Sequence, residues 1–148
     1  METPELSASI RLCREVLDEW IRDTGTYLSS YPKAEIQGFF SSCSLTQKEI
    51  ATDYYKYAAT VCRHWDRVAE QLVEIGTLMQ NADARMDAET VSRCDAIFEQ
   101  GDQFRDALDV YLTECETILK SERPLPKLYK RTQAFLVAAE QFRSSVAI

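Results

Sequence analysis

Four stretches of the chain carry apolar residues at alternating spacings of four and three, the repeat that places side chains along one face of an α-helix. A helix with such a stripe buries it by packing against other helices. The pattern therefore predicts an all-α fold. The first stripe consists of Leu6, Ile10, Cys13, Leu17, Trp20, Thr24, Tyr27 and Tyr31.

The other three stripes have the same period. The second runs through Ile50 or Ala51, Tyr54, Ala58, Val61, Trp65, Val68, Leu72, Ile75 and Met79. The third runs through Cys94, Ile97, Gly101, Phe104, Leu108, Tyr111, Cys115 and Ile118. The fourth runs through Leu125, Leu128, Thr132, Phe135, Ala139, Phe142 and Val146.

Capping residues and prolines set the expected helix boundaries. Thr3 suits an N-cap and is followed by a proline, which is favoured at the first helical position. Thr46 and Glu49 have the spacing of a capping box, which opens a second helix that runs to about residue 80. Asp87 can cap a third helix that runs to about residue 121, and the prolines of residues 121–126 lead into the fourth.

The sequence thus predicts an antiparallel up-and-down four-helix bundle of long helices, formed by a single domain over residues 1–148. Residues 32–45 are many for a helix-to-helix connection and leave room for a short extra helix. The principal alternative is a homodimer in which two long helices from each of two chains form the core.

Charge and cysteine content narrow the function classes. The formal net charge is −7 and the pI is about 4.8, which disfavours direct nucleic-acid binding and anionic membranes and favours basic protein partners. The five cysteines form no CxxC pair, the chain has one histidine, and the N-terminus does not resemble a secretory signal. We therefore expect a cytoplasmic protein without a metal or other cofactor.

An uninterrupted acidic row accompanies the third stripe. Asp95, Glu99, Asp102, Asp106 and Asp109 follow at spacings of four, three, four and three, so they share one face of the helix, opposite the core. Each pair of like charges at these spacings costs a helix about 0.2–0.5 kcal/mol. This face is either simply solvated or a docking surface for a basic partner.

Phe39 and Phe40 are the second candidate for partner binding. They are adjacent large aromatic residues among turn-forming residues. They either plug one end of the core or lie exposed as anchors at a protein interface, where aromatic residues contribute much of the binding energy.

Candidates for chemistry are few. His64 is expected on the flank of its helix with a local hydrogen bond, and a phosphotransfer histidine is the sharper alternative. Glu15 and Asp18, like Glu99 and Asp102, have an acid-x-x-acid spacing that helical magnesium-dependent nucleotide hydrolases use. No pattern of this kind is specific in a chain that is 28% charged.

Basic residues gather at the start of the fourth helix. Because antiparallel packing places this segment beside the end of the third helix, we expect pairing with Glu114 and Glu116. An anion-binding patch is the alternative. The basic residues are Arg123, Lys127, Lys130 and Arg131.

The sequence therefore favours a non-enzymatic protein–protein interaction module, such as a chaperone, adaptor or immunity-type inhibitor. It would dock a basic or amphipathic partner on the acidic helix face. The alternative is a signalling or catalytic helical bundle, either a histidine phosphotransfer domain or a magnesium-dependent nucleotide hydrolase.

Overall fold

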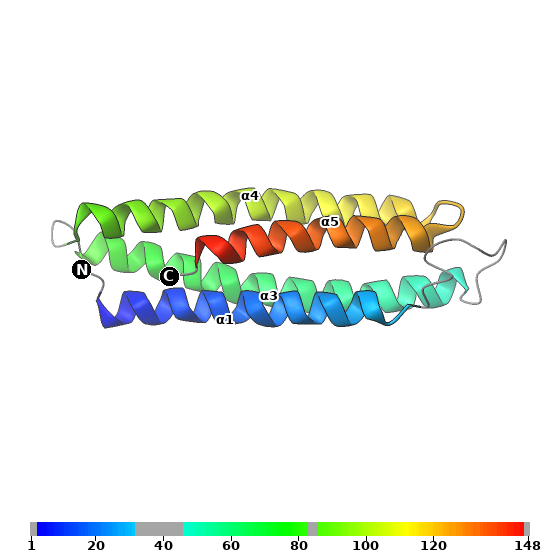
Figure 1. Cartoon of the computed structure of the whole chain (residues 1–148), viewed down its shortest axis with the longest axis horizontal. Helices are drawn as coiled ribbons and strands as arrows, with labels where there is room; N and C mark the ends of the chain where they lie inside the picture. Colours follow the sequence, from blue (N-terminus) through cyan, green and yellow to red (C-terminus); the bar gives the residue numbers. More distant parts are fainter. Residues whose placement is uncertain (1–2, 32–45, 83–85, 147–148) are drawn as a thin grey trace.

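The computed structural model describes residues 3–31, 46–82 and 86–146, which form four long helices (Figure 1). Consecutive helices run in opposite directions along a common long axis, so the predicted antiparallel bundle is confirmed. The longest helix has 36 residues and spans roughly 54 Å at 1.5 Å per residue. The helices are α1 (Pro4–Ser29), α3 (Gln47–Ala82), α4 (Ala88–Leu119) and α5 (Pro124–Ser145).

The helices are not packed equally tightly against one another. α1 packs extensively along α3, and α4 packs extensively along α5. Contacts of α1 with α5 and, more sparsely, of α3 with α4 join these two hairpins into a four-membered ring. Helices α1 and α3 are therefore direct neighbours over most of the length of α1.

Side-chain caps start three of the helices at the predicted places. Thr3 Oγ1 accepts a hydrogen bond from the backbone N–H of Leu6 at 3.2 Å. Thr46 Oγ1 accepts one from the N–H of Glu49 at 3.1 Å. Asp87 accepts one from Thr90 at 2.7 Å. Each cap satisfies a backbone donor that has no partner inside its helix.

The predicted stripes form the core. Every residue of the fourth stripe is buried, and so is every residue of the third except the half-buried Ile118. Two residues beside the second stripe, Tyr57 and His64, are also buried, at 6% and 4% exposure. The buried surface of α3 is therefore wider than its apolar stripe, and it includes polar groups.

The predictions for residues 32–45 lie outside the described residues. These are the short extra helix and the placement of Phe39 and Phe40. Within the part of the chain that the structure describes, no helix combines the length and apolar character needed to cross a membrane.

Candidate functional site

The acidic face of α4 consists of Asp95, Glu99, Asp102, Asp106 and Asp109. All five side chains are exposed. None of their carboxylates makes a hydrogen bond or an ion pair with another residue that the structure describes. The row predicted from the sequence is thus a continuous exposed surface on one helix.

Several acids elsewhere in the bundle contact a cation, in contrast to this face. Asp18 on α1 accepts a hydrogen bond at 2.6 Å from Arg143 on α5. Glu114 on α4 pairs with Arg131 on α5, which also lies over the ring of Tyr111 at 5.5 Å from the ring centre. These cations bind near helix interfaces and leave the acidic face uncompensated.

The immediate surroundings of the acidic face are mixed. Arg105 is three residues after Asp102 and four before Asp109, and it is exposed without a partner in the described part of the chain. Val110 is four residues after Asp106 and is 49% exposed. The face therefore offers mainly carboxylates, with one cation and one apolar side chain at its border.

Among the described residues, the expected pairing between the basic start of α5 and the acidic end of α4 is found for one pair. Arg131 pairs with Glu114, as the antiparallel arrangement predicts. Glu116 instead accepts a hydrogen bond from the hydroxyl of Tyr55 on α3 at 2.8 Å. Lys127 bonds the backbone carbonyl of Glu122 at 3.3 Å.

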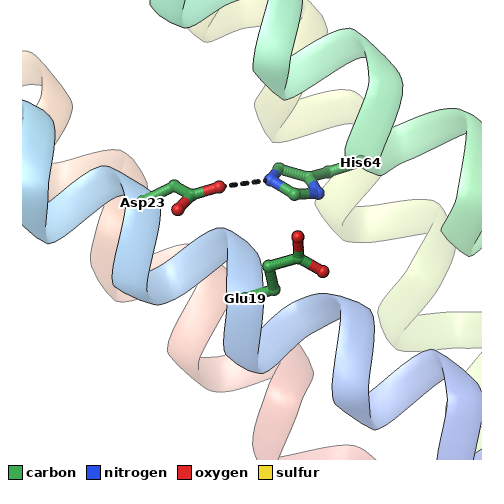
Figure 2. A group of neighbouring side chains, drawn as sticks. All are labelled: Glu19, Asp23 and His64. Atoms are coloured by element: carbon green, nitrogen blue, oxygen red, sulfur yellow. Dashed lines mark hydrogen bonds and ion pairs between the residues drawn. The ribbon is translucent and has the colours of Figure 1, made fainter.

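A second polar group lies between α1 and α3. Glu19 and Asp23, four residues apart on α1, approach the ring of His64 in the middle of α3 (Figure 2). His64 Nε2 lies 2.9 Å from Asp23 Oδ2. Because an ionised carboxylate only accepts hydrogen bonds, Nε2 carries the hydrogen and donates it. Glu19 in turn accepts a hydrogen bond from Arg67 on α3 at 3.0 Å.

The His64 ring is held by packing as well as by Asp23. It stacks on the indole of Trp20, with ring centres 5.7 Å apart. Its other nitrogen, Nδ1, is buried and has no hydrogen-bond partner among the described residues. A buried polar atom without a partner costs free energy, so this ring is positioned at some expense to stability.

Tyr57 extends the same polar strip one heptad earlier on α3. Its hydroxyl lies 2.6 Å from Thr24 Oγ1 on α1. Burial raises the pKa of Tyr57 above its usual range. The hydroxyl therefore stays protonated and serves as a hydrogen-bonding group rather than an anionic ligand.

Two shallow grooves lie along α3. One, of about 470 Å³, lies between α1 and α3 and is lined by Asp23, Asp53, Lys56 and neighbouring residues. The other, of about 430 Å³, lies between α3 and α4 and is mostly apolar, with the exposed Cys62 in its lining. The first groove shares Asp23 with the group formed by Glu19, Asp23 and His64, the histidine cluster.

The predicted chemical candidates do not assemble into one centre. Glu15 lies 3.9 Å from Arg11, and Asp18 binds Arg143, so these two acids engage separate cations. Glu99 and Asp102 lie on the exposed face of α4. The arrangement that sequence reasoning missed is the convergence of two α1 acids on His64.

No protein family, curated protein or solved structure matches the chain.

Proposed function

We propose that the chain is a protein-binding module that docks a basic or amphipathic partner on the acidic face of α4. The observation that carries the proposal is the exposure of five carboxylates in one row, without a bonded cation in the described part of the chain. Each neighbouring pair of like charges destabilises the helix, so the row lowers the stability of the free protein. A role in binding would explain why the chain carries it.

The surroundings of the row are consistent with an amphipathic partner. Val110 places an exposed apolar side chain at the border of the acidic face. The basic residues of an amphipathic partner helix would pair with the carboxylates of the acidic face, and its apolar strip would contact Val110. Charge complementarity of this sort mainly increases the association rate and the specificity.

The burial of His64 weighs against the phosphotransfer alternative. With 4% exposure and Nε2 bonded to Asp23, the ring presents no free nitrogen at the surface for a phosphoryl donor. A phosphoacceptor histidine must be reached by a second protein. His64 is not accessible in this way, whereas the carboxylates of the acidic face are exposed to a partner protein.

The test is charge reversal on two faces of the same molecule. The double variant Asp102→Lys/Asp106→Lys reverses the centre of the acidic face. The matched control, Glu70→Lys/Glu74→Lys, makes the same change of net charge at two exposed acids, also four residues apart, on α3. Proteins captured from lysate are quantified at low and high salt for the wild type and both variants.

We expect a set of proteins that the wild type and the α3 control capture at low salt and that the α4 variant does not capture. High salt should release these proteins from the wild type. Salt sensitivity follows because ions screen contacts between exposed charges. If both variants capture the same proteins as the wild type, the acidic face is a solvated surface and the proposal is wrong. If both lose the same proteins, the effect is one of net charge and the proposal is equally wrong.

A further inference from the structure

We propose that Glu19, Asp23 and His64 form a binding site for a divalent transition-metal ion, with Zn²⁺ as the ion of choice. The proposal rests on the geometry between α1 and α3 and is independent of the acidic face of α4. One donor atom from each residue lies within 4.8 Å of the other two. Figure 2 shows both carboxylates approaching the histidine ring from α1.

The donor types fit a first-row transition metal. Imidazole nitrogen is a ligand for zinc, copper, iron and nickel, whereas magnesium and calcium prefer oxygen. Zinc accepts His nitrogen and Asp or Glu oxygen as ligands, and catalytic zinc sites use three protein ligands and leave the fourth position to water. A single imidazole with two carboxylates therefore favours zinc over magnesium.

The distances fit as well. Two zinc–ligand bonds of about 2.1 Å in tetrahedral geometry put the two donor atoms about 3.4 Å apart, a separation that a small side-chain rotation reaches from the arrangement seen here. His64 Nε2 and Asp23 Oδ2 are 2.9 Å apart. A bound ion would take the place of the Nε2 hydrogen, off the line between these two atoms, and the neutral ring would then carry its hydrogen on the buried Nδ1. Glu19 supplies the third donor after a small side-chain rotation.

Burial and packing hold the central ligand in place before any ion arrives. His64 is more than nine-tenths buried, and stacking on Trp20 fixes the plane of its ring. Its Nε2 points at the carboxylate of Asp23. The side chains of Asp23 and Glu19 are 39% and 40% exposed, which leaves the outer side of the site open to water.

Arg67 is the natural competitor for this site. Its guanidinium binds Glu19 at 3.0 Å and neutralises that carboxylate in the metal-free protein. An ion that binds Glu19 must displace Arg67 or share the carboxylate with it. Removal of Arg67 should therefore strengthen metal binding, whereas removal of a true ligand should weaken it.

The experiment uses the untagged full chain, because a histidine tag would itself bind zinc. His64 is the only histidine, so the ring ¹⁵N resonances of histidine-labelled protein report on this residue alone. Zn²⁺ is titrated into the wild type, Glu19→Gln, Asp23→Asn and Arg67→Gln. The control is Arg63→Gln, which removes the same charge one turn earlier on α3.

We expect Zn²⁺ to shift the Nε2 resonance of the wild type and Mg²⁺ to leave it unchanged. Loss of either carboxylate should weaken Zn²⁺ binding by at least the roughly 10–100-fold seen when residues that only hydrogen-bond to the metal ligands are removed. Arg67→Gln should bind more tightly than Arg63→Gln. Circular dichroism of each variant establishes that the bundle is intact, and Glu19→Gln tests the site without disturbing the His64–Asp23 bond.

Three outcomes would overturn the proposal. Zn²⁺ could bind while the His64 resonances stay unmoved, which would place the ion at thiols or at acids elsewhere. Glu19→Gln and Arg67→Gln could both match Arg63→Gln, which would exclude Glu19 as a ligand. Zn²⁺ at millimolar concentration could also leave every resonance unchanged, which would mean that there is no site.

Discussion

Asp106→Asn should stabilise the protein by removing repulsion within the acidic face. Asp106 lies four residues after Asp102 and three before Asp109, so the substitution removes two like-charge pairs. The other two facing positions hold Gln103 and Val110, so no favourable ion pair is lost. At 0.2–0.5 kcal/mol per pair, the gain is about 0.4–1 kcal/mol.

Helix propensity does not change this expectation, because Asp and Asn have similar values in a helix interior. For a domain of this size the gain raises the melting temperature by roughly 1–4 °C. Thermal unfolding at low salt measures the shift. At 1 M salt, where the Debye length is about 3 Å, most of the difference between Asp106→Asn and the wild type should vanish.

The control for this experiment is Glu140→Gln on α5. Glu140 is also exposed, but its only charged neighbour at three or four positions is Arg143, so its removal should give no gain. Equal stabilisation by both variants would show that the effect follows net charge rather than the row. A gain for Asp106→Asn that persists at 1 M salt, or no gain at low salt, would refute the reasoning.

Two further predictions concern α1 and the thiols. Gly25→Ala should stabilise by about 0.5–1 kcal/mol in chemical denaturation, because an added Cβ meets no atom within 4 Å and alanine is the better helix former; a loss of stability would contradict this. Iodoacetamide should alkylate the exposed Cys62 of the native protein well before Cys13, whose pKa burial raises to about 12. Mass spectrometry of the labelled peptides measures the two alkylation rates. Comparable rates for Cys62 and Cys13 would contradict the second prediction.

The helices and the core could be predicted because the stripes are nearly unbroken and the caps use standard residues. Thr3, Thr46 and Asp87 each make the predicted type of bond to a backbone N–H. The stripes of α4 and α5 needed only the helical period, since the buried Gly101 and Thr132 keep that period. Local chemistry and periodicity therefore sufficed for these elements.

The histidine cluster could not be predicted in this way, because it depends on the register between α1 and α3. Periodicity within each helix does not define how far α1 is shifted along α3. A signal was nevertheless present: Tyr57 and His64 are seven residues apart, hence in the same heptad position, and both bond α1. Polar residues that repeat at one heptad position can therefore belong to the buried surface of a helix, as these two do.

The aromatic rings in the middle of the bundle bear on the cooperativity of unfolding. Trp20 of α1 meets Phe104 of α4 edge-on, with ring centres 5.0 Å apart, and Phe135 of α5 at 5.9 Å. It also stacks on His64 of α3. One side chain thus touches every other helix, so the two hairpins cannot separate without exposing it. The bundle should unfold in a single step, with amide exchange slowest around Trp20 and fastest at the helix ends.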